Sequence, residues 1–157
     1  MNREIKFRGQ RKLNGKWVYG SYIAIGEDWC QIVPVGTEYD EINVEKTRVI
    51  TETVGQYAGF KDKNGVDVYE DDIVEAWSAG SKGIFRIVFR QEGSPCWLLY
   101  PNGQNRKFWN IHVTEYSKEK KFISLEGNPY KSEKEGFYDT GLVVIGNYHE
   151  HPELLPK

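Results

Sequence analysis

The acidic residues Glu70, Asp71 and Asp72 form the densest run of side chains in this sequence that could do chemistry. Carboxylates act as general acids and bases, and they coordinate hard cations. In an extended strand, however, adjacent side chains point to opposite faces, so three consecutive carboxylates cannot all line one pocket. Aspartate also accepts hydrogen bonds from nearby backbone amides in turns. We therefore interpret Asp71 and Asp72 as a tight turn leading into Ile73 and Val74, and we expect the acidic residues of this stretch to be mainly turn and surface groups. A catalytic role would require convergence on one pocket.

The position of Gly65 allows the same stretch to be compared with a calcium-binding loop. An EF-hand loop has glycine at its sixth position and an oxygen ligand at its first. Counting back from Gly65 puts Phe60 at the first position, and phenylalanine has no ligand atom. The calcium interpretation fails there. The sequence predicts instead a turn at residues 63–65, between two strands, with Val68, Ile73 and Trp77 in the core.

His149 and His151 would project from one face of an extended segment, as a pair of metal ligands could. No third ligand lies nearby in sequence, and His112 would have to complete the site in space. Surface or capping histidines are commoner, so we predict no metal and no other cofactor. The motifs of serine hydrolases, zinc proteases and P-loop nucleotide hydrolases are also missing. We do not expect an enzyme, and metal-assisted hydrolysis by the two histidines is the weakest alternative.

The composition is that of a globular protein, with 157 residues, 39% hydrophobic and 14% aromatic. The formal net charge of −2 lacks the positive field of a general nucleic-acid binder. Charge is uneven, however. Residues 1–16 carry six basic residues against Glu4, a net of +5, and residues 62–75 carry six acidic residues against Lys63, a net of −5. The two segments could neutralise one another, within a chain or between chains.

The cysteines and the apolar runs bear on location. Cys30 and Cys96 are far apart, and each is next to a tryptophan, which is typical of small buried residues and not of a disulfide framework or a thiolate zinc site. The charged N-terminus does not resemble a signal peptide, and no apolar run approaches the roughly 20 residues that span a bilayer. We expect a cytoplasmic protein without a membrane partner.

The balance of residue types predicts a mainly β fold of antiparallel hairpins with little helix. Valine and isoleucine outnumber alanine and leucine, and branched side chains favour strands. The pairs Asn14-Gly15, Asn64-Gly65 and Asn102-Gly103 suit two-residue hairpin turns. A single turn should begin at Pro152. The predicted strands are residues 3–8, 17–23, 30–35, 47–54, 66–77, 83–90, 96–100, 107–116 and 141–148, and residues 126–139 should be a surface loop.

Nucleic-acid binding is the main functional alternative. Residues 3–8 alternate, which predicts Ile5 and Phe7 on a buried face and the charged residues on a solvated face. A basic arm can contact phosphates, and aromatic residues on strands can stack on bases, although the acidic segment 62–75 would repel phosphate. The candidate binding residues are Arg3, Lys6, Arg8, Trp77 and Trp109.

Four blocks of the sequence resemble the YopX-like proteins of bacteriophages and prophages. They are REIKFRG at 3–9, GKWVYG at 15–20, ETVGQYAGFKDKNGVDVYEDDIV at 52–74 and VIGNYHEHPELL at 144–155. The resemblance implies a mostly β protein with an SH3-like barrel built from the central hairpin onward. We expect an N-terminal hairpin region at 1–55 and the barrel with a C-terminal strand at 56–157, either separate or integrated. The family usually has glycine where this chain has Asp71, which puts a glycine-only backbone conformation there in doubt.

The resemblance carries over no catalytic residue, so the expected function rests on surface properties. We expect a phage-encoded binding or assembly module without catalysis, in the cytoplasm of the bacterial host, that acts through a protein partner or as a homo-oligomer. Open strand edges and the uneven charge motivate this expectation, because both favour association.

Overall fold

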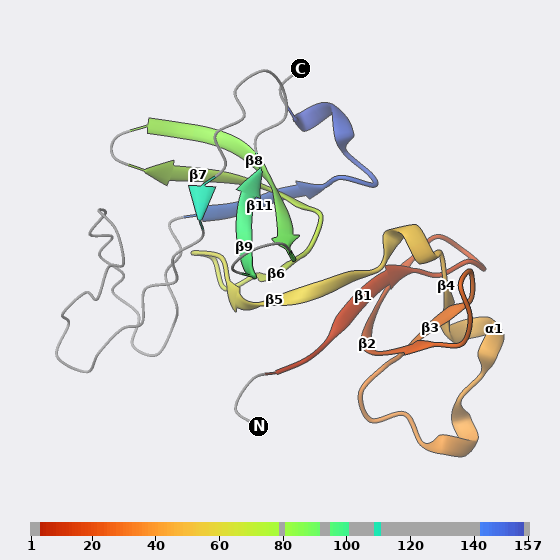
Figure 1. Ribbon diagram of the computed structural model, residues 1–157. Helices are drawn as coiled ribbons and strands as arrows, with labels where there is room; N and C mark the ends of the chain where they lie inside the picture. Colours follow the sequence, from red (N-terminus) through yellow and green to blue (C-terminus); the bar gives the residue numbers. More distant parts are fainter. Residues whose placement is uncertain (1–3, 79–80, 92–94, 101–108, 111–141, 156–157) are drawn as a thin grey trace, which may run out of the picture. The chain divides into compact units, whose positions relative to one another are not determined.

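The computed structural model describes residues 4–78, 81–91, 95–100, 109–110 and 142–155 (Figure 1). These residues form mainly antiparallel β-strands with very little helix, as the composition predicts. The chain divides into two compact units, residues 1–59 and 60–157. The division lies inside β5 (Gly55–Lys61), a few residues beyond the region boundary expected at 55/56.

The first unit contains a run of short antiparallel strands in the order β4, β3, β2, β1 and the first part of β5. Their bounds are β1 (Phe7–Gln10), β2 (Trp17–Ala24), β3 (Cys30–Val33) and β4 (Arg48–Val49). The connections include η1 (Tyr39–Glu41), α1 (Val44–Thr47) and η2 (Thr51–Thr53). The core consists of Val18, Cys30, Ile32 and Val49, with Phe7 and Val54 packed against it. The prediction that Cys30 is buried is therefore confirmed.

Strand β2 changes its partner at Gly20. Its residues 17–20 pair with β1, whereas residues 21–24 pair with β3. A Cβ atom at Gly20 would strike the backbone carbonyl of Val33 and lie 2.8 Å from the Cα of Pro34. Only glycine permits this close approach of two backbones, and a glycine at such a point is typical of a bend in a strand. The bend leaves residues 21–24 without β1 beside them.

The second unit is built on an antiparallel sheet in the order β10, β9, β8, β7 and β11. The bounds are β6 (Asp67–Tyr69), β7 (Asp72–Ser78), β8 (Ser81–Arg90), β9 (Cys96–Tyr100), β10 (Trp109–Asn110), β11 (Leu142–Asn147) and η3 (Pro152–Leu154). Val68, Ile73, Val74 and Ile87 have no exposed surface. The core positions predicted for Val68 and Ile73 are confirmed. Trp77 lies on β7, but its side chain is outside the described residues.

Several sequence expectations about local structure need correction. Residues 47–54 are not one strand, because residues 51–53 form the 3-10 turn η2, in which the Thr53 hydroxyl donates to Ile50 O at 2.6 Å. Residues 3–8 are not one strand either, since β1 begins at Phe7. The first hairpin has a four-residue turn at 12–15, not a two-residue one, and only Gly15 has positive φ. Of the predicted strand at 107–116, the structure describes only residues 109–110, and both lie in strand β10.

Other expectations have a clearer outcome. The strand at 96–100 and the turn beginning at Pro152 are confirmed. The turn at Asn102-Gly103 and the loop at 126–139 lie outside the described residues. The described strands do not close into a barrel, so the SH3-like barrel stays a prediction. Within the described chain, no helix has the length and apolar character needed to cross a membrane.

Candidate functional site

The three consecutive carboxylates lie at the turn between β6 and β7 and do not converge. Glu70 and Asp71 form the turn, and Asp72 begins β7 with 1% of its surface exposed. An oxygen of Asp72 accepts a hydrogen bond from the Tyr69 amide at 2.8 Å, across the turn. The predicted turn is present, but it lies one residue earlier than expected, because Asp72 already belongs to β7. The doubt about a left-handed backbone was wrong, because Asp71 has a φ of 67°.

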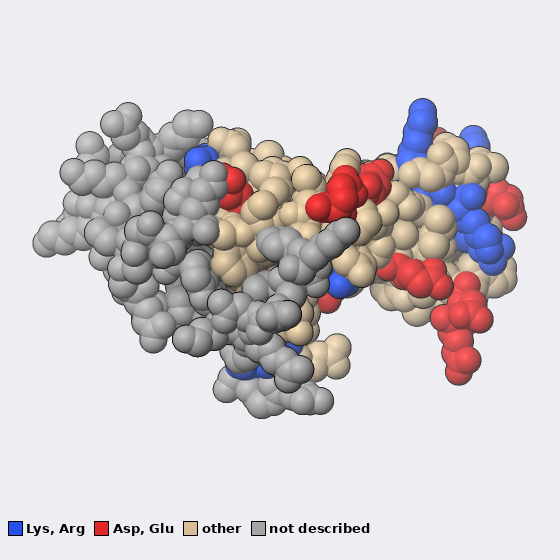
Figure 2. Space-filling view, turned by 90° about the horizontal axis from the view of Figure 1, so that it is seen from above, with Lys and Arg blue, Asp and Glu red and all other residues tan. Residues whose placement is uncertain are grey.

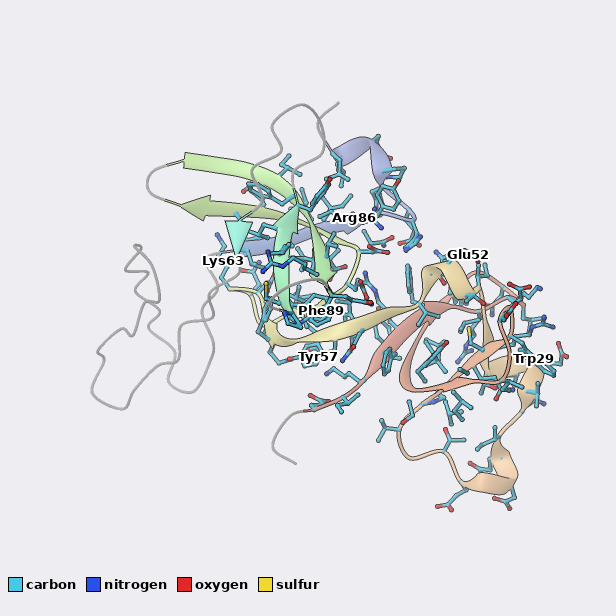
Figure 3. The ribbon with its side chains drawn as sticks, in the orientation of Figure 1. Trp29, Glu52, Tyr57, Lys63, Arg86 and Phe89 are labelled. Carbon is cyan, nitrogen blue, oxygen red and sulfur yellow. The ribbon has the colours of Figure 1, made fainter. Side chains whose placement is uncertain are left out.

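Asp71 is the centre of a polar cluster that joins three parts of the second unit. One oxygen of Asp71 accepts hydrogen bonds from Arg86 on β8, with distances of 2.8 Å to Nε and 2.7 Å to Nη2 (Figure 3). The other oxygen lies 3.0 Å from Nε2 of His149, which follows β11. The backbone of Asp71 donates to Ile87 O at 2.9 Å and accepts from the Tyr148 amide at 2.8 Å. These hydrogen bonds offset the free-energy cost of the left-handed backbone conformation at Asp71.

The charges of this cluster are largely balanced internally. The guanidinium of Arg86 lies 3.8 Å from the ring centre of Tyr148, a favourable cation–π geometry. Burial acts to raise the pKa of Asp71, but hydrogen bonds from His149 and Arg86, with their charge, lower the pKa below its ordinary value. A carboxylate that two partners keep ionised is suited to connecting the segments that carry those partners through ion pairs. Each carboxylate oxygen of Asp71 has a side-chain partner, Arg86 for one and His149 for the other.

Asp62 has a structural role that the sequence analysis did not identify. It is 3% exposed, and one of its oxygens accepts from the amides of Asn64 and Val66 at 2.8 and 2.9 Å. The other oxygen accepts from the Val144 amide on β11 at 3.1 Å. The signal was present in the sequence, because an aspartate directly before a turn with Asn64-Gly65 commonly caps that turn. Residues 63–65 form the predicted turn, with Gly65 at a φ of 83°.

The remaining charges in the segment 62–75 also face partners. Asp67 forms an ion pair with Lys61. Two of the six acidic residues, Asp62 and Asp72, are buried, and two others, Asp67 and Asp71, are ion-paired within the same unit. These residues were expected to be mainly turn and surface groups. The turn is present, but these four carboxylates are buried or ion-paired and are not free surface groups. Little of the −5 charge of this segment is available to attract residues 1–16.

The two C-terminal histidines have different surroundings. His149 contacts Asp71, whereas His151 lies in an exposed position at the start of η3. In the described residues, no three histidine, cysteine or acidic side chains are arranged to hold a metal ion. His112 lies outside those residues.

The candidate nucleic-acid residues are not gathered into one site. Arg8 is only 7% exposed and lies over the Trp17 ring at 4.8 Å, so the expected solvated face does not include it. Lys6 lies 4.3 Å from the ring centre of Tyr57 and 3.2 Å from Glu4. Ile5, expected to be buried, is 52% exposed. Arg3 and the side chains of Trp77 and Trp109 are outside the described residues, and a binding role for all five remains a prediction.

Three exposed apolar side chains of the first unit lie on the β2–β3 hairpin. Tyr22, Ile23 and Ile25 are 37%, 42% and 51% exposed. Residues 21–24 pair with β3 on one side, and the described residues supply no strand on the other side. We call residues 21–24 the open edge of β2. Trp29 directly precedes β3, and the centre of its ring lies 5.3 Å from the guanidinium of Arg48 (Figure 3).

An acidic segment that the sequence analysis missed follows this hairpin. Residues 27–46 carry six acidic residues against Lys46, a net of −5: Glu27, Asp28, Glu38, Asp40, Glu41 and Glu45. All six are exposed, and no ion pair to them is found in the described part of the chain. In Figure 2, acidic side chains project from the right-hand part of the described surface, where basic side chains also lie. The signal was available from the sequence as a second run of net charge.

Comparison with known proteins places the chain in a family. No curated protein matches the sequence. Among solved structures, the crystal structure of protein EF1440 from Enterococcus faecalis matches with 19% sequence identity and a TM-score of 0.39, over 99% of this chain and 100% of that one. The sequence profile described as YopX protein matches residues 6–156, nearly the whole chain. The protein therefore belongs to the YopX family.

Proposed function

We propose that this protein is a non-catalytic binding or assembly module that acts through a protein partner. The observation that carries the proposal is the open edge of β2, flanked by the exposed side chains of Tyr22, Ile23 and Ile25. Unpaired strand edges expose backbone donors and acceptors to which another chain can pair. Exposed apolar side chains beside such an edge add the contact area that a protein partner would bury.

The polar clusters of the second unit support a module without catalysis. Asp62 binds three backbone amides, and Asp71 binds Arg86 and His149. Side chains that are committed to holding turns and strands together are poorly placed to transfer protons to a substrate. Their arrangement suits a stable scaffold that presents a surface.

Nucleic-acid binding is the less favoured candidate. Phosphate contacts require basic side chains that reach solvent. Arg8 is buried over Trp17, and the acidic segment 27–46 would repel phosphate. The proposal also includes three features implied by resemblance to YopX-like proteins: a phage or prophage origin, a location in the host cytoplasm and an SH3-like barrel. An experimental structure of the whole chain would test the barrel directly.

Affinity capture from bacterial lysate, with and without nuclease, tests the proposal. The tagged full chain should retain a protein after nuclease treatment. Ile23→Lys should abolish retention, whereas Val66→Lys should not, because Val66 is 49% exposed and lies in the second unit. Light scattering after size exclusion at two salt concentrations would report self-association. A strictly monomeric chain that retains no protein would contradict the proposal, and material lost on nuclease treatment would favour nucleic-acid binding.

A further inference from the structure

The hydrogen-bond pattern of the β2–β3 hairpin shows which backbone groups face the open edge of β2. The Ile25 amide donates to Trp29 O at 2.9 Å, so residues 25 and 29 form a hydrogen-bonded pair. In an antiparallel ladder, such pairs alternate with pairs whose backbone groups point away from one another. The amides and carbonyls of Tyr22 and Ala24 therefore point away from β3, toward the open edge. In the described part of the chain these groups have no partner strand.

The side chains on the open edge of β2 offer apolar contacts on both faces of an added strand. Tyr22 lies on the core side, with its ring centre 5.2 Å from that of Phe7. Ile23 alternates to the opposite face, where it is 42% exposed. A strand added at this edge would place its own alternate side chains next to Tyr22 and Ile23. An extended peptide with alternating apolar residues fits both faces.

The charge at the tip of the β2–β3 hairpin bears on the choice of partner. Glu27 and Asp28 form the tip of the hairpin, and the rest of the acidic segment 27–46 follows β3 in the same unit. If the open edges of two copies paired with one another, two acidic segments of net −5 would meet in the contact and would repel. A basic segment would be attracted, and its lysine or arginine residues would meet carboxylates that have no ion pair in the described residues.

We propose that the open edge of β2 binds an extended, basic segment of a partner protein, which adds to the sheet as a β-strand and contacts the acidic segment 27–46. This inference rests on the proposed binding function and specifies its surface and its partner. Backbone pairing supplies affinity in this mode, and alternate side chains supply specificity. The bend at Gly20 provides the edge, because it separates residues 21–24 from β1.

A displayed library of random peptides of about ten residues, which is longer than a typical strand, tests the inference on the full chain. Selection should enrich peptides of net positive charge in which valine, isoleucine or tyrosine alternates with lysine or arginine. Ala24→Pro removes an amide at the open edge, and a paired Glu27→Lys, Asp28→Lys variant reverses the charge of the tip. Each should weaken an enriched peptide at least about tenfold, a factor typical of losing one good contact. Glu153→Lys, an exposed reversal in the second unit, should leave binding unchanged.

Amide hydrogen exchange provides the second readout and detects unfolded variants. The enriched peptide should slow exchange at Tyr22 and Ala24 in the folded protein. No enrichment, enrichment of acidic or proline-rich peptides, or binding unaffected by Ala24→Pro would overturn the inference. Slow exchange at the open edge without peptide, in a dimer, would also overturn it in favour of a second copy. If capture from lysate persists with both variants, the proposed function survives and this inference alone fails.

Discussion

Residues 62–75 and residues 27–46 have the same formal charge of −5, from six acidic residues and one lysine each, but opposite roles. In 62–75, Asp62 and Asp72 are buried as acceptors for backbone amides, and Asp71 is held by Arg86 and His149. In 27–46, the six carboxylates are exposed on a hairpin tip and a long connection.

The difference shows that net charge along a chain does not predict surface charge. The two segments differ in whether hydrogen-bond donors of the protein lie next to their carboxylates. Asp62 and Asp72 stand at turns, where nearby amides lack ladder partners and need acceptors. Asp71 meets a guanidinium and an imidazole that come from distant parts of the chain. The carboxylates of 27–46 are exposed and have no ion pair in the described residues, which leaves them available for association.

Replacing Asp62 should have the largest effect. Asp62→Ala leaves three amides without their acceptor, those of Asn64, Val66 and Val144. Unsatisfied buried groups cost about 1–3 kcal/mol each, and partial access to water should limit the total to roughly 2–4 kcal/mol. Urea unfolding measures the change in the free energy of unfolding. Asp28→Ala is the matched control and should change it by less than about 0.5 kcal/mol. Equal losses at the two positions would contradict the comparison.

Two substitutions of Asp71 should separate its ion pairs from its backbone strain. Asp71→Ala loses the bonds to Arg86 and His149 and should cost about 1.5–3 kcal/mol. Asp71→Gly loses the same bonds but relieves the left-handed conformation, worth roughly 1 kcal/mol. The glycine variant should therefore be the more stable of the two in thermal or urea unfolding. The reverse order would mean that the turn does not keep its positive φ.

The ion pairs of Asp71 should also make stability depend on pH. A carboxyl whose pKa is lowered by folding stabilises the native state fully above its ordinary pKa of about 4. That contribution is lost as pH falls through the lowered native value, because the unfolded chain binds the proton first. The difference in unfolding free energy between the natural chain and Asp71→Asn should thus shrink from pH 7 to below pH 4. A difference independent of pH would contradict an ionised, paired Asp71.

Charge reversal in the exposed segment should have the smallest effect on stability. Glu27→Lys with Asp28→Lys should change the free energy of unfolding by less than about 0.5 kcal/mol per substitution, as exposed sites usually do. The same variant should lose its basic peptide ligand. A large loss of stability would show that these carboxylates hold the fold together, as those of 62–75 do.

The strand pattern was largely predictable because it depends on local signals. The strand at 96–100 lies between Pro95 and Pro101, and its observed bounds are those expected. The predicted strand at 47–54 failed because Thr53 bonds to the Ile50 carbonyl and to the Gln10 amide, which favours a 3-10 turn over an extended chain. Threonine has a high strand propensity, but its hydroxyl also caps turns, and the contact with Gln10 is not visible in the local sequence.

The sequence by itself determined the mainly β class, most strands, the turn at residues 63–65 and the family, because alternation, branched residues and Asn-Gly pairs act over a few neighbours. Only the tertiary structure decided that Arg8 is buried and that Asp71 meets Arg86 and His149. It also decided that residues 21–24 have a partner strand on one side only, among the residues that the structure describes. These properties depend on contacts between residues far apart in the chain. Burial and hydrogen bonding are set by what the fold brings to each side chain, and the charge of a residue alone does not reveal them.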